Sequence, residues 1–311
     1  MSTNTRGACL CGAVTFAIAA PYRWFTHCHC SLCRKHHGSL FGTGLGVARE
    51  RFRWLAGADA IVHYRATAAF ERPFCRHCGT TVPAVSHDER FWHVPAGLLD
   101  GDPGAQPRSH IFVASRSPLH ELDDVLPRHA AYPPGIDLPI VASRPVPAAA
   151  NGVTPLRGLP RVAGRCLCAA VAFAVTATPQ RVVNCYCSLC RRRSGAAFTS
   201  TLLAAATDFR WLRGEARIRH YVMPAPLGSP RRGAPRSYGA DFCADCGSPV
   251  PTLPAGQPGV MLPAGAIDSE LPPLPAVHLY VASKAPWVAI TDAGPQFAEL
   301  PPAERFTEFF R

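Results

Sequence analysis

Fourteen cysteines form two copies of one seven-cysteine pattern, and this repeat constrains the fold more than any other feature. Each copy contains, in order, a C-x-C, a C-x-C-x-x-C and a C-x-x-C element. The first copy has Cys9, Cys11, Cys28, Cys30, Cys33, Cys75 and Cys78. The second copy has Cys166, Cys168, Cys185, Cys187, Cys190, Cys243 and Cys246. Self-similarity at a fixed spacing indicates two copies of one domain in tandem.

The repeat extends beyond the cysteines. The sequence Phe-Arg-Trp-Leu occurs at residues 52–55 and again at 209–212. Residues 110–115, which read His-Ile-Phe-Val-Ala-Ser, match residues 278–283, which read His-Leu-Tyr-Val-Ala-Ser. The two copies are therefore related over most of their length.

Two segments interrupt the repeat. The second copy has an insertion within Met223–Ser237 that is rich in Pro, Gly and Arg, which predicts a surface loop. The copies are joined by a stretch rich in Pro, Ala and Gly, which predicts a semi-rigid linker. We expect a first cysteine-containing domain over residues 1–131, the linker over 132–160 and a second cysteine-containing domain over 161–311.

Short apolar runs flanked by Gly, Pro and Asp predict strands, because many of them contain β-branched and aromatic residues. In the first copy the runs are Ala13–Ile18, Leu40–Val47, Phe91–Val94 and Ile111–Val113. In the second copy they are Val171–Val175, Phe198–Leu203 and Leu279–Val281. No long stretch has a 3.6-residue period, although Leu202–Ala206 fits strand and helix equally. The sequence therefore predicts an all-β fold held together by metal.

The cysteine spacings are typical of metal sites, since one turn can direct two or three sulfurs at a single ion. No signal peptide and no run of about 18 apolar residues is visible, so we expect a cytoplasmic protein without a membrane span. Thiols stay reduced in that compartment, and an odd number per copy does not pair completely as disulfides. Zinc is the expected ion because it favours tetrahedral thiolate sites.

Seven ligands divide into a closed site of four and an open site of three. Spacing alone does not decide the division, but two close pairs make an economical four-ligand site. That division predicts two zinc ions per copy, up to four in all. The groups of four would be Cys9, Cys11, Cys75 and Cys78, and Cys166, Cys168, Cys243 and Cys246. The groups of three would be Cys28, Cys30 and Cys33, and Cys185, Cys187 and Cys190.

The alternative for each group of three is a centre closed by a histidine. The first copy permits this, because its group of three is surrounded by His27, His29, His36 and His37. The equivalent positions of the second copy hold Asn184, Tyr186, Arg193 and Ser194. If both copies share one geometry, an open centre with a position for water or substrate is favoured.

These elements, in this order, resemble the glutathione-dependent formaldehyde-activating enzyme family, which includes centromere protein V. The resemblance covers roughly Arg6–Leu126 and Arg165–Phe297. It is carried in the first copy by Gly7–Gly12, Cys28–Lys35, Phe74–Thr80 and Gly97–Asp100. It implies two β-tent domains of small antiparallel sheets and the same division into four and three cysteines. It also implies a carbon–sulfur lyase reaction run in reverse, in which glutathione and formaldehyde give S-hydroxymethylglutathione.

Each copy departs from the family pattern. The first has His37 before Gly38, where the family usually has a small hydroxyl residue, whereas the second keeps that residue as Ser194. The second has Tyr186 between two cysteines in place of His29. Either copy is therefore a candidate for the active one.

Basic residues directly follow the third cysteine of each group of three. They are Arg34, Lys35, Arg191 and Arg192. We interpret them as candidate ligands for the carboxylates of glutathione, since arginine binds carboxylates bidentately. The alternative is a solvated charged surface or charge balance for the thiolates.

Two functions from different classes follow. The first is a zinc-dependent enzyme that adds a small thiol to an aldehyde at the open centres. The second is a zinc-stapled scaffold that binds a protein or nucleic acid without chemistry. The formal net charge of +11 favours nucleic acid only weakly, because zinc-bound thiolates would remove part of it and no basic–aromatic stripe is present.

Overall fold

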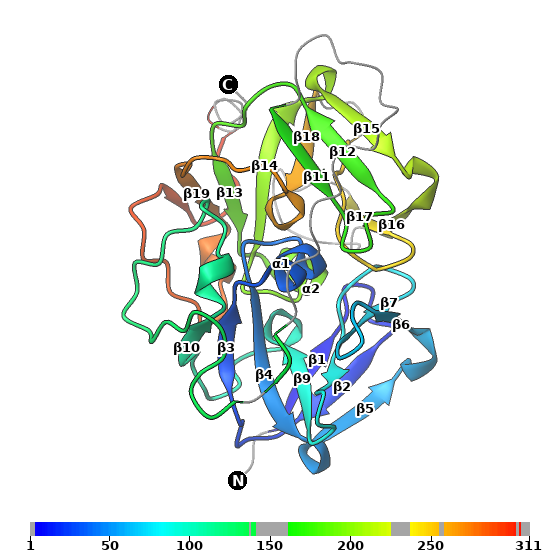
Figure 1. The fold of residues 1–311 in the computed structure, drawn as a ribbon, viewed down its shortest axis with the longest axis vertical. Coiled ribbons are helices and arrows are strands. Elements are labelled where there is room, and N and C mark those ends of the chain that lie inside the picture. Colours follow the sequence, from blue (N-terminus) through cyan, green and yellow to red (C-terminus); the bar gives the residue numbers. More distant parts are fainter. Residues whose placement is uncertain are drawn as a thin grey trace.

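The computed structural model describes residues 4–136, 138–140, 161–224, 237–254, 258–302 and 305. It has two halves that correspond to the two cysteine repeats, the first drawn in blue to cyan and the second mainly in green to orange (Figure 1). The predicted all-β fold class is confirmed, since the described residues contain many short strands and two short α-helices. None of the described helices is long and apolar enough to span a membrane.

The elements follow nearly the same order in both halves, except that β8 has no counterpart strand in the second half and β20 has none in the first. The strands of the first half are β1 (Thr5–Ala8), β2 (Thr15–Ile18), β3 (Phe25–Cys28), β4 (Gly42–Ala48), β5 (Phe52–Ala56), β6 (Ile61–Arg65), β7 (Glu71–Cys75), β8 (Ala84–Val85), β9 (Phe91–Pro95) and β10 (Ser109–Ile111). Those of the second half are β11 (Val162–Arg165), β12 (Ala172–Val175), β13 (Val182–Cys185), β14 (Thr199–Ala205), β15 (Phe209–Arg213), β16 (Ile218–Pro224), β17 (Ser237–Cys243), β18 (Gly259–Pro263), β19 (Ala276–Leu279) and β20 (Gln296–Phe297). The α-helices are α1 (Ser31–His37) and α2 (Ser188–Ser194). Short 3₁₀ turns are η1 (Arg49–Arg51), η2 (Ala58–Ala60), η3 (Ala96–Leu98), η4 (Val113–Ser115), η5 (Ala206–Asp208), η6 (Glu215–Arg217), η7 (Ala264–Ala266) and η8 (Val281–Ser283).

Each half is built from three small sheets. In the first half their strand orders are β1-β2-β5, β6-β7 and β10-β3-β4-β9-β8. In the second half they are β11-β12-β15, β16-β17 and β18-β14-β13-β19-β20. Most pairings are antiparallel, but β10 runs parallel to β3 and β19 runs parallel to β13, so the largest sheets are mixed.

Five of the seven predicted runs coincide with strands to within two residues at each end, but Ile111–Val113 and Leu279–Val281 share only their first residue with β10 and β19. The predicted strand at Ile111–Val113 ends early because Phe112 takes a left-handed conformation (φ 58°) and a 3₁₀ turn follows. Tyr280 does the same (φ 58°) after β19. Leu202–Ala206, which fitted two structures, is strand to Ala205 and then turns. Of the predicted insertion loop, residues 225–236 lie outside the described residues, and its ends extend β16 and β17.

The two α-helices are too short to give a periodic signal, and each contains one cysteine and is capped by another. Cys30 caps the start of α1, where its Sγ accepts a hydrogen bond from the Cys33 amide, and Gly38 ends the helix with φ 64°. Cys187, the Cys190 amide and Gly195 repeat this arrangement around α2. The N-cap hydrogen bond and the left-handed glycine thus determine where each short helix begins and ends. Helix propensity alone does not determine these positions.

One continuous hydrophobic core joins the halves. Phe16, Phe25 and Phe173 belong to a single buried cluster. The Phe25 and Trp287 rings meet at 5.4 Å between centroids, and the equivalent residues Phe41 and Phe198 meet at 5.3 Å. The halves therefore fold against each other.

Each short helix packs on a turn of the opposite half: α1 contacts η7, and α2 contacts η3. The C-terminal ends of the helices meet near the centre of the molecule, where His37 Nδ1 donates to the Ser194 carbonyl at 2.6 Å (Figure 1). The packing of each helix on the opposite turn requires a glycine in that turn. A Cβ at Gly265 would lie 2.0 Å from the Arg34 carbonyl oxygen, and one at Gly97 would lie 2.2 Å from that of Ala196.

Candidate metal centres

Each half brings four cysteine sulfurs together. In the first half, Cys9 and Cys11 lie in the turn after β1, and Cys75 and Cys78 lie at the end of β7. The Cys9 and Cys11 sulfurs are 3.4 Å apart, and the Cys11 and Cys75 sulfurs are 3.7 Å apart. A tetrahedral zinc with bonds of roughly 2.3 Å places its sulfurs about 3.8 Å apart. The group therefore fits zinc.

The second half reproduces this group. The Cys166 and Cys168 sulfurs are 3.4 Å apart, and those of Cys168 and Cys243 are 3.7 Å apart. Cys246 completes the set, and all four sulfurs lie within 4.8 Å of one another. We call these two sets the four-cysteine groups.

The surroundings of the four-cysteine groups are also repeated. The Val14 amide donates to Cys9 Sγ at 3.3 Å, and the Val171 amide donates to Cys166 Sγ at 3.3 Å. Hydrogen bonds to neighbouring thiols and burial raise the pKa of Cys9 far above its ordinary value in the absence of metal. A divalent cation is what allows four buried thiols to ionise together.

The remaining cysteines form two sets that we call the three-cysteine groups. Cys28 ends β3, Cys30 caps α1 and Cys33 lies in its first turn, so a strand end and a helix start direct three sulfurs to one point. The second half builds the same group from Cys185, Cys187 and Cys190. Within each group the sulfurs lie within 4.8 Å of one another. The structure thus groups the cysteines as the economical division predicts.

Each histidine near the first three-cysteine group forms a hydrogen bond through one ring nitrogen, while Nδ1 of His29 and of His36 has no partner among the described residues. His27 Nδ1 lies 2.9 Å from Thr43 Oγ1, His36 Nε2 bonds Thr81 Oγ1, and His37 bonds Ser194. His29 Nε2 lies 2.8 Å from His110 Nδ1. Among the described residues, neither three-cysteine group gathers a histidine, aspartate or glutamate ligand atom as a fourth member.

A comparison with known families assigns the chain. The model for the glutathione-dependent formaldehyde-activating enzyme matches residues 4–115 and again 161–283, together more than half of the chain. The chain belongs to this family. It contains two copies of the family's domain, as the cysteine repeat predicts.

The chain is also similar to individual proteins. A Halomonas elongata protein with the provisional name of glutathione-dependent formaldehyde-activating enzyme is 33% identical over 131 residues, which cover 41% of this chain and 79% of the relative. A crystal structure of a Rhodobacter sphaeroides protein matches with a TM-score of 0.28 and 24% identity, over 31% of this chain and 89% of that one.

In this member of the formaldehyde-activating enzyme family, each three-cysteine group lies beside the four-cysteine group of the opposite half. Cys30 and Leu32 pack in the same cluster as Cys166, Cys243 and Cys246. Leu189 packs against the cluster that contains Cys9 and Cys75. Both halves therefore contribute to the surroundings of every centre.

A hydrogen-bonded chain leads from an aspartate to the residue between the first two cysteines of each three-cysteine group. In the first half, Asp124 Oδ2 lies 2.8 Å from His110 Nε2, and His110 Nδ1 reaches His29. Because the carboxylate accepts, His110 donates from Nε2 to Asp124. Burial is the largest cause that lowers the pKa of His29, to about 2, so this ring is neutral.

The second half has an equivalent hydrogen-bonded chain, but a tyrosine takes the place of the final histidine. His278 Nε2 lies 2.8 Å from Asp292 Oδ1, and Tyr186 OH lies 2.8 Å from His278 Nδ1, to which it donates. Sequence reasoning missed His110 and Asp124. The available signal was the histidine that recurs at the same place in both copies, at residues 110 and 278.

The basic residues after the cysteines separate into two kinds. Lys35 Nζ pairs with Asp268 at 2.8 Å and donates to the carbonyls of Arg165 and Ala266, so it bridges the halves. Arg192 pairs with Asp100 in the equivalent contact. Both aspartates belong to the opposite half and occupy equivalent positions.

Arg34 and Arg191 lie closer to the sulfurs. Arg34 Nε donates to the His29 carbonyl at 3.3 Å, and its charge acts on Cys30. Arg191 acts in the same way on Cys187, and its buried Nε has no hydrogen-bond partner in the described part of the chain.

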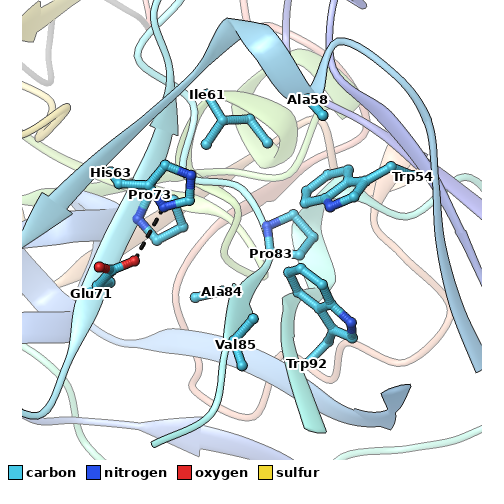
Figure 2. Close-up of a pocket in the computed structure, with 10 residues that line it drawn as sticks. All are labelled: Trp54, Ala58, Ile61, His63, Glu71, Pro73, Pro83, Ala84, Val85 and Trp92. Carbon is cyan, nitrogen blue, oxygen red and sulfur yellow. Dashed lines mark hydrogen bonds and ion pairs between the residues drawn. The ribbon is translucent and has the colours of Figure 1, made fainter. Parts of the chain in front are cut away.

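A small pocket of about 130 Å³ lies on the first half (Figure 2). Trp54, Trp92 and two prolines give it an apolar lining, and His63 pairs with Glu71 at 3.1 Å on one side. No cysteine lines it, so it offers no thiol or metal chemistry of its own.

Proposed function

We propose that each three-cysteine group holds zinc with one position left for an exogenous ligand, and that a small thiol adds to an aldehyde there. One observation supports this most directly: three sulfurs converge in each half, and among the described residues no histidine, aspartate or glutamate ligand atom joins them. Three protein ligands with an open fourth position are typical of catalytic rather than structural zinc. The four-cysteine groups would hold the structural ions, which gives two zinc ions per half.

The reaction is the addition of the thiol of glutathione to formaldehyde. A bond forms between sulfur and the aldehyde carbon, the carbonyl π bond is lost, and the thiol proton ends on the former carbonyl oxygen. The product is S-hydroxymethylglutathione, and the reverse reaction is a carbon–sulfur lyase reaction. Zinc, when bound, would lower the pKa of the thiol or polarise the aldehyde oxygen.

The residues of the chain hold and orient the reactants. Cys28, Cys30 and Cys33, or their counterparts in the second half, hold the metal. Arg34 and Arg191 are the basic residues best placed to bind a glutathione carboxylate, because their charges act near the sulfurs and Arg191 Nε has no partner in the described residues. Lys35 and Arg192 are already paired with aspartates, so they would act on glutathione only through the position of the helix.

The reduced cysteines that metal binding requires indicate the cellular compartment in which the protein would act. Fourteen cysteines serve as ligands only while they are reduced, and the cytoplasm keeps them so. We therefore propose that the protein acts in the cytoplasm, with glutathione available as substrate.

The test is exchange spectroscopy with ¹³C-labelled formaldehyde and glutathione, because the adduct also forms without an enzyme. Zinc-loaded, reduced protein should accelerate exchange between free formaldehyde and the adduct, and metal-free protein should not. Four zinc ions per chain are expected by elemental analysis.

Two variants locate the reaction. Cys30→Ser and Cys187→Ser each disrupt one three-cysteine group and leave both four-cysteine groups intact. If the full protein binds four zinc ions and does not accelerate the exchange, the proposal of an enzyme is wrong. The favoured function is then that of a zinc-stapled scaffold that binds a protein or nucleic acid without chemistry.

A further inference from the structure

The two three-cysteine groups face different side chains that come from equivalent strands. In the first half, Arg72 Nη2 in β7 lies 3.9 Å from Cys33 Sγ. In the second half, Tyr238 in β17 donates its hydroxyl to Cys190 Sγ at 3.4 Å. Cys33 and Cys190 are equivalent residues, so one sulfur faces a cation where the other faces a neutral hydroxyl.

The difference is built into the register of the strands. β7 and β17 end at equivalent cysteines, Cys75 and Cys243, so Arg72 corresponds to Ala240 and Phe70 corresponds to Tyr238. Positions two apart lie on the same face of a strand. The first half thus has a long cation at one position and an apolar ring beside it. The second half has a methyl group at the first position and a phenol at the second.

Arg72 is held in place. Its guanidinium lies over the Phe70 ring at 5.6 Å from the centroid, and Nη1 donates to the Glu71 carbonyl at 3.0 Å. The charge of Arg72 acts on Cys33, Cys30 and Cys28, so it faces the whole group. Among the residues that the structure describes, no carboxylate forms an ion pair with Arg72.

Other charges near the two groups do not cancel this difference. Arg34 and Arg191 are equivalent and act on equivalent cysteines. Arg193, in the second half, donates to Thr252 Oγ1 at 3.4 Å and acts on Tyr238. Tyr132 lies near the first group, but burial raises its pKa, so its hydroxyl stays neutral.

We propose that the three-cysteine group of the first half is the one that binds a thiolate as the fourth ligand of its metal. Arg72 favours this because it stabilises the added negative charge. Zinc with three thiolates carries one negative charge, and a fourth thiolate brings a second. A cation in contact stabilises such a partly buried dianion, and Arg72 provides one where Tyr238 offers only a neutral hydroxyl. The centre of the second half is then expected to keep a neutral fourth ligand. This inference rests on the proposed function, because it requires a metal at each three-cysteine group.

The test is ¹¹³Cd NMR of the full chain loaded with cadmium, which reports each centre by its own resonance. Cys30→Ser and Cys187→Ser assign the two resonances from the three-cysteine groups. Glutathione, added under reducing conditions, should shift the first-half resonance towards that of a four-sulfur site and leave the second-half resonance in place. Arg72→Met should weaken this binding at least tenfold, and Arg72→Lys should keep part of it.

Arg65→Met is the matched control, since it removes an exposed cation from the same hairpin without touching a sulfur. Unchanged resonances of the four-cysteine groups will show that each variant is folded. Equal saturation of both centres, or full affinity in Arg72→Met, overturns the assignment to the first half but leaves the proposed function standing. If glutathione shifts neither resonance, the proposed function fails together with this inference.

Discussion

Lys35 of the first half and Asp268 of the second half are joined at 2.8 Å between Nζ and Oδ1, with both side chains nearly buried at 10% and 12% exposure. Asp268 also accepts from Arg165 Nε at 3.0 Å. The equivalent pair on the other side of the interface, Arg192 and Asp100, is far more open, with 31% and 45% exposure. One chemical contact thus occurs twice in this chain in two different dielectric environments.

Asp268→Asn should destabilise the protein by about 3 kcal/mol, because it leaves the nearly buried Lys35 ammonium without its counter-charge. Asp100→Asn should cost about 1 kcal/mol or less, since solvent screens the exposed pair. Urea unfolding in excess zinc measures both. Equal losses in the two variants would show that burial does not set the strength of these contacts.

The contact between helix and turn gives a second prediction. Gly265→Ala should destabilise the protein by about 3 kcal/mol or more, because the new Cβ would lie 2.0 Å from the Arg34 carbonyl oxygen and backbone must shift. Gly239→Ala is the control, since no atom lies within 4 Å of a Cβ built there. Thermal unfolding of both variants tests this, and a Gly265→Ala protein as stable as Gly239→Ala would argue against a close interface.

The cysteine centres were predictable from sequence because their ligands come in short, repeated elements. Two or three sulfurs within a C-x-C or C-x-x-C element are bound to lie close together, whatever the rest of the fold does. The repeat then supplies the same information twice. The strands were predictable for a similar local reason, apart from ends such as Phe112, where a bulky residue adopts a left-handed conformation that no local pattern announces.

Contacts between the halves were not predictable. Lys35 in a run of basic residues looks like a substrate ligand or a solvated charge, and its partner Asp268 lies in the other copy. Arg72 carried no signal because its equivalent, Ala240, is uncharged, so comparing the copies does not single it out. Its importance comes from the register of β7 relative to Cys33, which is tertiary information.

Acid should destabilise the protein partly through His93. Burial, followed by the charge of Arg72, lowers its pKa to about 3, against roughly 6.5 in an unfolded chain. Between these values the unfolded state binds more protons than the folded state. The stability that neutral His93 contributes is therefore complete above pH 6.5 and is lost as the pH falls towards 3.

His93→Gln should make this loss shallower by up to about 1.4 kcal/mol per pH unit. Urea unfolding at several pH values from 4.5 to 7.5, with zinc in excess for both proteins, gives the two slopes. Metal loss at low pH affects both proteins, so the difference between the slopes isolates the histidine. Parallel profiles would mean that the ring takes up a proton without unfolding.

The two kinds of cysteine group should respond differently to loss of one ligand. Cys78→Ser removes a sulfur from a group that joins the turn after β1 to the end of β7, so it should cost several kcal/mol of stability along with one zinc. Cys33→Ser removes a sulfur from residues that already share one strand end and one helix, so zinc is lost with a smaller cost in stability. Elemental analysis and urea unfolding of each variant measure the two effects. A Cys33→Ser protein as unstable as Cys78→Ser would show that the three-cysteine group is a structural site, and would remove the basis for an open, reactive centre there.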